Sequence, residues 1–350
     1  MFHLQKMLFL SHKINLMLNQ RKINWGIIGL GKIARKFAAD LQLVPNATLH
    51  AVASTSAERA HAFAAQYQVP HVFESYEAIL DCPDLDVVYI ATPHRFHCEN
   101  TLMCLSRKMP VLCEKPIGMN AYEVQQMMNA SIQNKTFLME AFWTQFIPAF
   151  KKAMNLLQSG VIGKPLSIKA DFGFAAPFDV EKRAFNKDLG GGSLLDIGLY
   201  PVFLALEVFG KPIDIQAFAQ FSTTGVDATC AILLKHNQGE ISMLHSTFTS
   251  LTNTEAYIYG EHGTIHIHPR FHHPEKVSLQ VHGKPLKEFS MPYNGNGYQF
   301  EIEEVNRCLK KNVLESSLLP LSKSALLAET LDKIRAKIGL VYPKHDFLNI

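Results

Sequence analysis

A glycine turn between an apolar strand and a helix constrains the fold of this chain more than any other feature. The apolar run at 23–28 predicts a strand, Gly29 and Gly31 predict a tight turn, and a helix is expected from about Lys32. With Ala34 as the third small residue, the pattern is G-x-G-x-x-A in a strand–turn–helix context, which is typical of a dinucleotide site. The glycines allow the backbone to approach a diphosphate at the helix N-terminus. The alternative is a structural turn without a ligand.

The alternation of strands and helices continues through the first 142 residues. Further strands are predicted at 47–54, 86–92, 111–113 and 136–140, with helices at 58–67, 96–106 and 121–130. Alternation of this kind produces a doubly wound parallel sheet. We therefore predict an NAD(P)-binding Rossmann domain at 22–142, preceded by an extension at 1–21 in which Met17 is a candidate start.

The second half of the chain has a different pattern. Strands of alternating character are predicted at 212–221, 228–235, 239–248, 255–260 and 263–268, with helices at 149–158, 194–209 and 298–310. This pattern predicts a substrate-binding α+β domain at 143–350 with an open, mostly antiparallel sheet, so the overall class is α/β. The histidine-rich run at 266–274 is expected to be a solvated hairpin loop. Because that run lacks cysteine or carboxylate ligands at a recognised spacing, no metal site is predicted.

The composition narrows the class of protein. A chain of 350 residues, 47% apolar and 19% charged, suits a globular protein of two domains. The net charge is only +3 and no basic run carries interleaved aromatic residues, so nucleic acid is not an expected partner. No segment reaches about eighteen uninterrupted apolar residues, so no membrane span is expected. The six cysteines are irregularly spaced, as reduced core residues of a cytoplasmic protein would be.

The end of the second predicted strand indicates which nicotinamide cofactor is preferred. Dinucleotide folds often place an acidic residue there for the ribose 2′-hydroxyl, but this chain has Ser54, Thr55 and Ser56. Hydroxyl groups can donate to a 2′-phosphate, and Arg59 lies one helical turn further on. NADP is therefore favoured, with NAD possible. The alternative is that these residues only cap the following helix, and both roles can coexist.

Polar residues gather at the carboxyl ends of the later strands, where open α/β sheets bind ligands. Lys115 directly follows one of these strands, and a cation there can reach the reacting end of a cofactor. The alternatives are a solvated lysine and, for the histidines, loop or cap residues. The residues expected to contact the cofactor are Gly29, Gly31, Lys32, Ile33, Ser54, Thr55, Arg59, Thr92, Pro93, His97, Glu114 and Lys115.

A glycine-rich run at 189–202 opens a helix that carries Asp196 and Tyr200, four positions apart and so on one helix face. With Lys115 they form a candidate acid/base set. A tyrosine needs a lowered pKa to exchange a proton near neutral pH, and a nearby ammonium group lowers it. The alternative is an acid near the helix N-terminus followed by a packed tyrosine.

The chain resembles the Gfo/Idh/MocA oxidoreductases from about residue 23 to residue 343, and within them the branch of dihydrodiol dehydrogenases and NADP-dependent D-xylose dehydrogenases. The motifs that carry the resemblance are GLGKIA, ATPHRFH, VLCEKP, MEAFWTQFIP, GGGSLLDIGLYP and LDKIRAKIGLVYP. The resemblance implies that Tyr200 is the catalytic acid/base, Lys115 its electrostatic partner and Asp196 a contact of the substrate hydroxyl. It also implies a homodimer through the exposed face of the second sheet. Gln145 departs from the branch, which usually has arginine there, so the substrate stays open.

We therefore expect an NADP-dependent enzyme that transfers hydride between nicotinamide and a hydroxyl-bearing carbon of a sugar, a cyclic polyol or a trans-dihydrodiol. Two alternatives remain. One is an NAD-dependent dehydrogenase of an inositol-like polyol. The other is a sensor protein that binds NADP(H) without turnover, because a fold does not fix a function.

Overall fold

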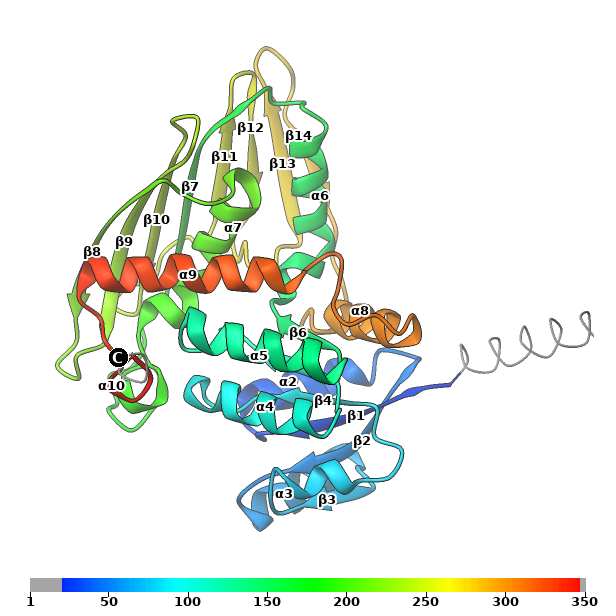
Figure 1. The fold of residues 1–350 in the computed structure, drawn as a ribbon. Coiled ribbons are helices and arrows are strands. Elements are labelled where there is room, and N and C mark those ends of the chain that lie inside the picture. Colours follow the sequence, from blue (N-terminus) through cyan, green and yellow to red (C-terminus); the bar gives the residue numbers. More distant parts are fainter. Residues whose placement is uncertain (1–20, 347–350) are drawn as a thin grey trace, which may run out of the picture.

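Two sheets organise residues 21–346, which are the residues that the computed structural model describes (Figure 1). The first sheet is entirely parallel, with the order β3-β2-β1-β4-β5-β6, which confirms the predicted doubly wound sheet. Of the extension predicted at 1–21, residues 1–20, with Met17, lie outside the described residues. The strands are β1 (Ile23–Ile28), β2 (Ala47–Ala53), β3 (His71–Phe73), β4 (Val87–Ile90), β5 (Val111–Glu114) and β6 (Leu138–Ala141).

Helices cover both faces of this sheet, which explains why its strands are apolar on both sides. In β1, Trp25 and Ile27 belong to one buried cluster and Ile28 to another. Between the strands run α2 (Lys32–Leu41), α3 (Ala57–Tyr67), α4 (His97–Ser106) and α5 (Ala121–Asn134), with short 3₁₀ turns η1 (Ala78–Asp81) and η2 (His94–Phe96).

The second sheet has the order β14-β13-β12-β11-β7-β10-β9-β8, in which β10 and β7 are parallel and every other pair is antiparallel. The predicted α+β domain with an open, mostly antiparallel sheet is therefore confirmed. Its strands are β7 (Pro165–Gly173), β8 (Asp214–Phe221), β9 (Asp227–Lys235), β10 (Ile241–Thr247), β11 (Ala256–Gly260), β12 (Gly263–Ile267), β13 (Lys276–Val281) and β14 (Lys287–Ser290).

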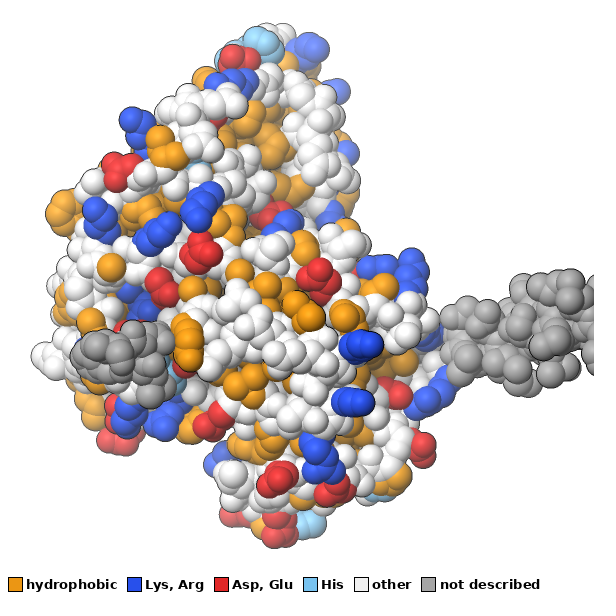
Figure 2. Space-filling model, viewed as in Figure 1, with side chains coloured by type: hydrophobic (Ala, Val, Ile, Leu, Met, Phe, Trp, Pro, Cys, Tyr) orange, Lys and Arg blue, Asp and Glu red, His pale blue; other side chains and the backbone are white. Residues whose placement is uncertain are grey.

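Three helices pack on one face of the second sheet: α6 (Pro148–Gln158), α7 (Leu199–Phe209) and α9 (Leu321–Ile338) (Figure 1). Strand residues alternate between this buried face and an exposed one. The exposed face carries large apolar side chains, of which Phe218 is 79% exposed, Leu233 49% and Met243 41%. In the view of Figure 2, which looks onto the α9 side, basic and acidic side chains are interspersed.

The helix predicted at 194–209 consists of two parts. A π-helical turn, η5 (Leu194–Gly198), precedes α7. The stretch Lys187–Phe209 is long and apolar enough to cross a membrane by length and composition, but 83% of its most apolar window is buried inside the protein. Burial on that scale is what a core helix of a folded domain shows.

Polar contacts join the two halves of the chain. Asp40, at the end of α2, accepts hydrogen bonds from the backbone amides of Asn296 and Tyr298, each at 2.9 Å. These two residues lead into α8 (Gln299–Lys310), which packs on α2. The Trp25 indole donates to Asn306 of α8 at 3.1 Å. Because both contacts are buried, they fix the second half of the chain against the first.

Candidate active site

A cavity of about 590 Å³ lies at the carboxyl ends of β1, β4 and β5 and extends to residues of the second half of the chain. Such a position is where doubly wound sheets bind their ligands. Ser54 and Thr55 do not line this cavity. Among the residues predicted from the sequence, those that line it are Gly29, Gly31, Lys32, Ile33, Arg59, Thr92, Pro93, His97, Glu114, Lys115, Asp196 and Tyr200.

At the glycine turn, the backbone faces the cavity without side chains in front of it. Gly29 has φ +86°, and a Cβ there would lie 2.8 Å from the backbone of Ala91, so only glycine fits. A Cβ on Gly31 would meet nothing within 4 Å, because open cavity space lies in front of it. Gly31 is also the N-cap of α2, whose first turn has no acidic residue. The N–H groups of this helix end are therefore available to an anion, as a dinucleotide diphosphate requires.

Cations, rather than the Ser54 and Thr55 hydroxyl groups predicted from the sequence, line the cavity. Arg59 lines it, and so does Lys36, which the sequence analysis did not single out. Ser54 is only 1% exposed and its hydroxyl accepts from the Ser56 amide at 3.1 Å, so this geometry does not present it to a phosphate. Ser56 caps α3 by accepting from the Arg59 amide at 3.3 Å, which confirms the capping alternative for that residue. Thr55 is exposed outside the cavity.

The central polar feature of the cavity is Asp196, which bridges two cations. Lys115 Nζ donates to its carboxylate at 3.0 Å and to its backbone carbonyl at 2.7 Å. Arg183 donates to the other carboxylate oxygen at 2.9 Å. Although burial alone raises the pKa of Asp196, Arg183 and Lys115 hold that pKa well below its usual range. Asp196 is therefore a permanent anion that fixes both cations in place.

Tyr200 lies beside these charges, but its environment differs from the one expected. Its hydroxyl accepts from the Trp143 indole at 3.0 Å, and Lys115 Nζ lies 5.3 Å from the centre of its ring. Burial, with Glu114 as the next cause, raises the pKa of Tyr200 well above its ordinary value. The expected lowering by Lys115 is wrong for this arrangement, because the ammonium lies over the ring and donates its hydrogen bonds to Asp196.

Glu114 lies at the end of β5 beside Tyr200. It is buried, and its carboxylate accepts from the Tyr89 hydroxyl. Burial raises the pKa of Glu114, while the neighbouring Lys115 charge lowers it. Glu114 lines the cavity and places a carboxyl group near Tyr200.

Two histidines after β4 hold the loops around the cavity. The His97 ring is fully buried, with Nε2 2.8 Å from the Thr92 carbonyl and Nδ1 2.7 Å from the Pro116 carbonyl. It thereby ties the loop after β4 to the loop after β5. His94, absent from our predicted set, lies 3.1 Å from both Arg183 and the Gly190 carbonyl. Burial lowers the pKa of both histidines, and it holds that of His94 well below its ordinary value, so His94 is a neutral positioning group at pH 7.

The histidine-rich run at 266–274 is not the solvated loop that we expected. His272 is buried, lines the cavity and stacks on Phe172 with ring centres 4.2 Å apart. His273 also lines it and lies 4.9 Å from the Trp143 ring. The segment turns inward because Thr144 donates to the His272 carbonyl at 2.5 Å and the rings pack together. No local pattern reveals this, since Phe172 and Trp143 lie far away in the sequence.

Aromatic rings form one wall of the cavity. Trp143 stacks on Tyr298 with centres 4.6 Å apart, and Tyr200 lies 5.2 Å from His272. The polar group of Lys115 and Asp196 lines the same cavity, with Lys115 Nζ 5.3 Å from the Tyr200 ring centre. Gln145, the residue that departs from the branch pattern, lies outside the cavity and donates to the Leu318 carbonyl at 3.0 Å. A site that combines aromatic rings with charged groups suits a small ring-shaped ligand that carries hydroxyl groups.

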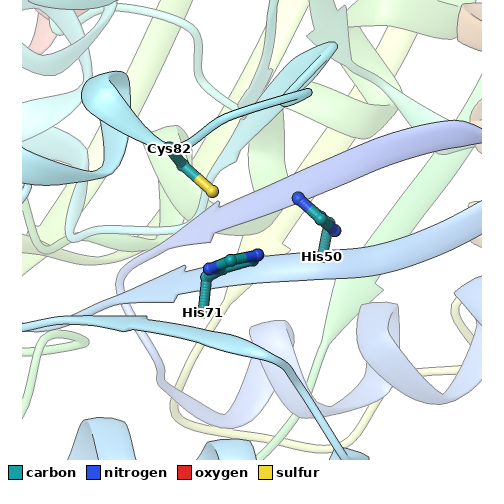
Figure 3. A group of neighbouring side chains, drawn as sticks. All are labelled: His50, His71 and Cys82. Carbon is teal, nitrogen blue, oxygen red and sulfur yellow. The ribbon is translucent and has the colours of Figure 1, made fainter.

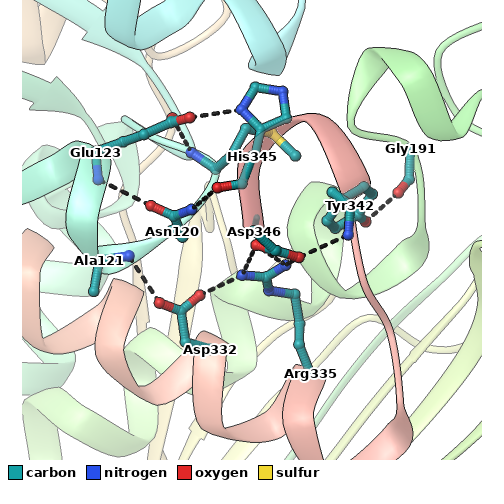
Figure 4. A network of polar contacts seen from close by, with 10 residues as sticks. Asn120, Ala121, Glu123, Gly191, Asp332, Arg335, Tyr342, His345 and Asp346 are labelled. Carbon is teal, nitrogen blue, oxygen red and sulfur yellow. Dashed lines mark hydrogen bonds and ion pairs between the residues drawn. The ribbon is translucent and has the colours of Figure 1, made fainter. Parts of the chain in front are cut away.

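The C-terminal segment anchors the glycine-rich turn that precedes Asp196 (Figure 4). The Tyr342 hydroxyl donates to the Gly191 carbonyl. The short helix α10 (Pro343–Asp346) is held by Arg335, which contacts Asp346 at 2.9 Å, and by Glu123, 2.6 Å from His345 (Figure 4). Residues far apart in the chain therefore cooperate to position the start of the helix that carries Asp196 and Tyr200.

Asp227 caps the start of the helix that follows this glycine-rich turn. Its carboxylate accepts from the Ser193 hydroxyl at 2.8 Å and from the Leu194 amide at 2.7 Å, and its other oxygen is buried without a partner among the described residues. Burial raises the pKa of Asp227 to about 7. The cap therefore changes its charge near neutral pH.

Comparisons with known proteins identify the family of the chain. The model of the oxidoreductase family with an NAD-binding Rossmann fold matches residues 23–142, and that of the GFO/IDH/MocA C-terminal domain matches residues 150–266. The chain is 39% identical over 331 residues to the trans-1,2-dihydrobenzene-1,2-diol dehydrogenase of Danio rerio, covering 91% of this chain and 98% of that protein.

Two solved structures share the fold. An aldose-aldose oxidoreductase from Caulobacter crescentus, complexed with glycerol, has a TM-score of 0.83 at 23% identity, covering 91% of this chain and 97% of that one. A 3-ketoreductase from Actinomadura kijaniata, in complex with NADP, has a TM-score of 0.82 at 24% identity, covering 91% of this chain and 98% of that one.

The Asp227 cap leads to a prediction about stability. The pKa of Asp227 is higher in the native state than the usual aspartate value, so the native protein binds the extra proton, and the stability from this group is lost as the pH rises from about 4 to about 7. Asp227→Asn removes that loss. At each pH, the free energy of unfolding of the Asp227→Asn variant is compared with that of wild type. This difference should rise by about 1–3 kcal/mol between about pH 5 and about pH 8. Urea denaturation measures this. Asp84→Asn, on the surface, is the control, and an equal rise in it would contradict the assignment.

Proposed function

The chain belongs to the Gfo/Idh/MocA family of oxidoreductases and is a dehydrogenase, and on that premise we propose that it oxidises a hydroxyl-bearing carbon of a trans-dihydrodiol or an aldose with NADP. The observation that carries the proposal is the single cavity in which Lys115, Asp196 and Tyr200 meet the glycine turn at Gly31. Hydroxyl recognition and dinucleotide binding thus share one space.

The dinucleotide would lie along the glycine turn. The backbone at Gly31 and the start of α2 would bind the diphosphate, and Lys115, at the end of β5, would lie beside the reacting ring. When bound, the nicotinamide accepts or gives the hydride. His97 holds the two loops that would flank this ring.

The proton moves separately from the hydride. In oxidation, the substrate carbon loses its hydrogen as hydride, and the hydroxyl proton passes to the phenolate form of Tyr200. In reduction, neutral Tyr200 donates its proton to the carbonyl oxygen. Because the pKa of Tyr200 is raised, the neutral form is the resting state. Lys115 and Asp196 bind and orient the substrate hydroxyl groups, and Lys115, with Nζ 5.3 Å from the Tyr200 ring centre, places a cation beside the developing charge.

The shape of the cavity supports a cyclic substrate. The wall formed by Trp143, Phe172 and His272 can stack on a planar or ring-shaped face, while Asp196 and Lys115 can bind vicinal hydroxyl groups. The named relative acts on a dihydrodiol of benzene, a ring with two neighbouring hydroxyl groups. An acyclic or cyclic aldose offers the same hydroxyl pattern without the flat apolar face.

The direct test is a turnover assay. Purified protein with NADP⁺ should give a continuing rise in absorbance at about 340 nm with trans-dihydrobenzenediol or with an aldose such as D-xylose. Turnover with NAD⁺ and inositol-like polyols alone would favour the polyol alternative. Cofactor binding without turnover on any of these would favour the sensor alternative.

The raised pKa of Tyr200 predicts the pH dependence of oxidation. A base acts only when deprotonated, so below its pKa the rate of the chemical step should rise about tenfold per pH unit, without a plateau near pH 7. Tyr200→Phe should lower kcat at least about a hundredfold and remove this slope. Tyr67→Phe is the control, because it loses only a hydrogen bond from the Tyr67 hydroxyl to the Arg35 carbonyl outside the cavity. This variant should keep the wild-type kcat and its pH slope. Initial rates across the pH range provide the measurement.

Lys115→Met extends the same experiment. It should lower kcat to a similar extent, and the double variant should lose little more, because the two residues serve one step. If Lys115→Met is inactive while Tyr200→Phe keeps most of its activity and its pH slope, the lysine is the proton-transfer group and the roles assigned here are reversed.

Preference for NADP should depend on Arg59. A charge-assisted contact with the 2′-phosphate is lost in Arg59→Ala, so the KM for NADP should increase about ten- to hundredfold while the KM for NAD changes little. Arg35→Ala is the matched control, since Arg35 lies on α2 beside Gln66 and outside the cavity. Equal effects on both cofactors would show that Arg59 does not read the phosphate.

The exposed apolar face of the second sheet supports a homodimer. Contiguous apolar patches on that scale are commonly buried between subunits. Sedimentation at micromolar concentration should give a dimer, and Phe218→Glu with Leu233→Glu should give a monomer. Ile132→Glu, which is 63% exposed on α5, is the control. A monomeric wild-type protein would refute this arrangement.

A further inference from the structure

Two histidines and a cysteine converge on the first sheet, away from the active site (Figure 3). His50 lies in the middle of β2, His71 begins β3, and Cys82 follows η1. One ligand atom of each lies within 4.8 Å of the other two, and in the described range 21–346 this is the one group of that kind. The three residues come from separate elements, and their spacing in the sequence matches no familiar metal motif.

The donor set is selective. Imidazole nitrogen and thiolate sulfur are ligands of zinc-type transition metals, whereas magnesium and calcium need oxygen. In a tetrahedral site with zinc bond lengths, donors lie about 3.3–3.8 Å apart, so the group needs to contract by about 1 Å. His50 and His71 are half-buried, while Cys82 is buried. A fourth position remains for water.

The other polar contacts of these side chains are few, and the Cys82 thiol donates only a long hydrogen bond, 3.7 Å, to the Pro83 carbonyl, which a metal–thiolate bond would replace. Neither ring nitrogen of His71 has a hydrogen-bond partner among the described residues, and its ring lies 4.6 Å from that of His50. His50 Nε2 lies 3.0 Å from the Pro83 carbonyl, which fixes its ring near the cysteine. Asp84 adds a negative charge beside Cys82. The surroundings therefore favour a cation.

We propose that His50, His71 and Cys82 form a binding site for a zinc-type divalent metal ion. None of the three residues lines the active-site cavity. His50 lies in β2 four residues before Ser54, which follows the carboxyl end of that strand, so about 13 Å of extended chain separates His50 from Ser54. The ion does not take part in the reaction. It links the edge strand β3 and the turn after η1 to β2, and so it stabilises the part of the domain that carries Arg59.

Cobalt titration of the full chain tests the site. Metal-free protein with a reductant should bind about one equivalent of Co²⁺ and show the near-ultraviolet absorption of a cobalt–thiolate bond, which Zn²⁺ should displace. Zn²⁺ should also raise Tm, because a ligand of the native state stabilises it. Cys82→Ser should lose the thiolate band, and His71→Asn should weaken Co²⁺ binding at least about tenfold.

The control is His61→Asn, an exposed histidine of α3 that lies 3.9 Å from Glu74, and it should bind Co²⁺ like wild type. Thermal unfolding without metal shows whether each variant is folded, and Cys82→Ala replaces Cys82→Ser if the latter is not. Absence of the thiolate band in the wild-type protein would overturn the proposal. So would a band that persists in a folded Cys82 variant.

Discussion

The buried carboxylate of Asp196, neutralised by Lys115 and Arg183, is the interaction on which the rest of this structure depends. A carboxylate so deeply buried is tolerated only when cations and donors surround it. Lys115 comes from the end of β5 in the first sheet, and Arg183 comes from the loop after β7. The ionic contact therefore joins the two halves of the chain at the cavity and sets the position of both cations.

Much of the fold around this contact serves to hold it. The C-terminal segment fixes the turn at 190–192 through Tyr342, and Asp227 caps the helical turn that follows. His97 and His94 hold the loops after β4 on the other side. The glycine turn at Gly31 remains bare, so the cavity has a rigid polar centre and an open end for a dinucleotide. Preorganised charge of this kind is what hydride-transfer sites need.

The sequence predicted the features that depend on local order. The run at 23–34, the strand–helix alternation and the change to alternating strands are encoded over a few residues each, and both sheets follow them. Lys115, Asp196 and Tyr200 were found because each follows a recognisable strand or glycine run. The proposed metal site of His50, His71 and Cys82 had no such signal, because it depends on how β2, β3 and η1 meet.

Features set by long-range contacts were missed or misjudged. Arg183 lies in a loop without periodicity, and His272 lies in a run that resembles a solvated hairpin until Phe172 packs on it. The expected lowering of the Tyr200 pKa was wrong because sequence shows that a lysine is near but not that Asp196 takes its hydrogen bonds. Ser54 was likewise assigned to the cofactor, although its burial depends on the fold around it.

The proposed function requires that hydride pass from a substrate carbon to a nicotinamide in this cavity. The most direct measurement uses a trans-dihydrodiol or aldose with deuterium on the hydroxyl-bearing carbon, followed by NMR of the cofactor after turnover. We expect deuterium at C4 of the reduced nicotinamide, and a rate of transfer at least about a hundredfold lower in Lys115→Met. A cofactor that binds but stays oxidised, with the deuterium still on the substrate, would contradict it.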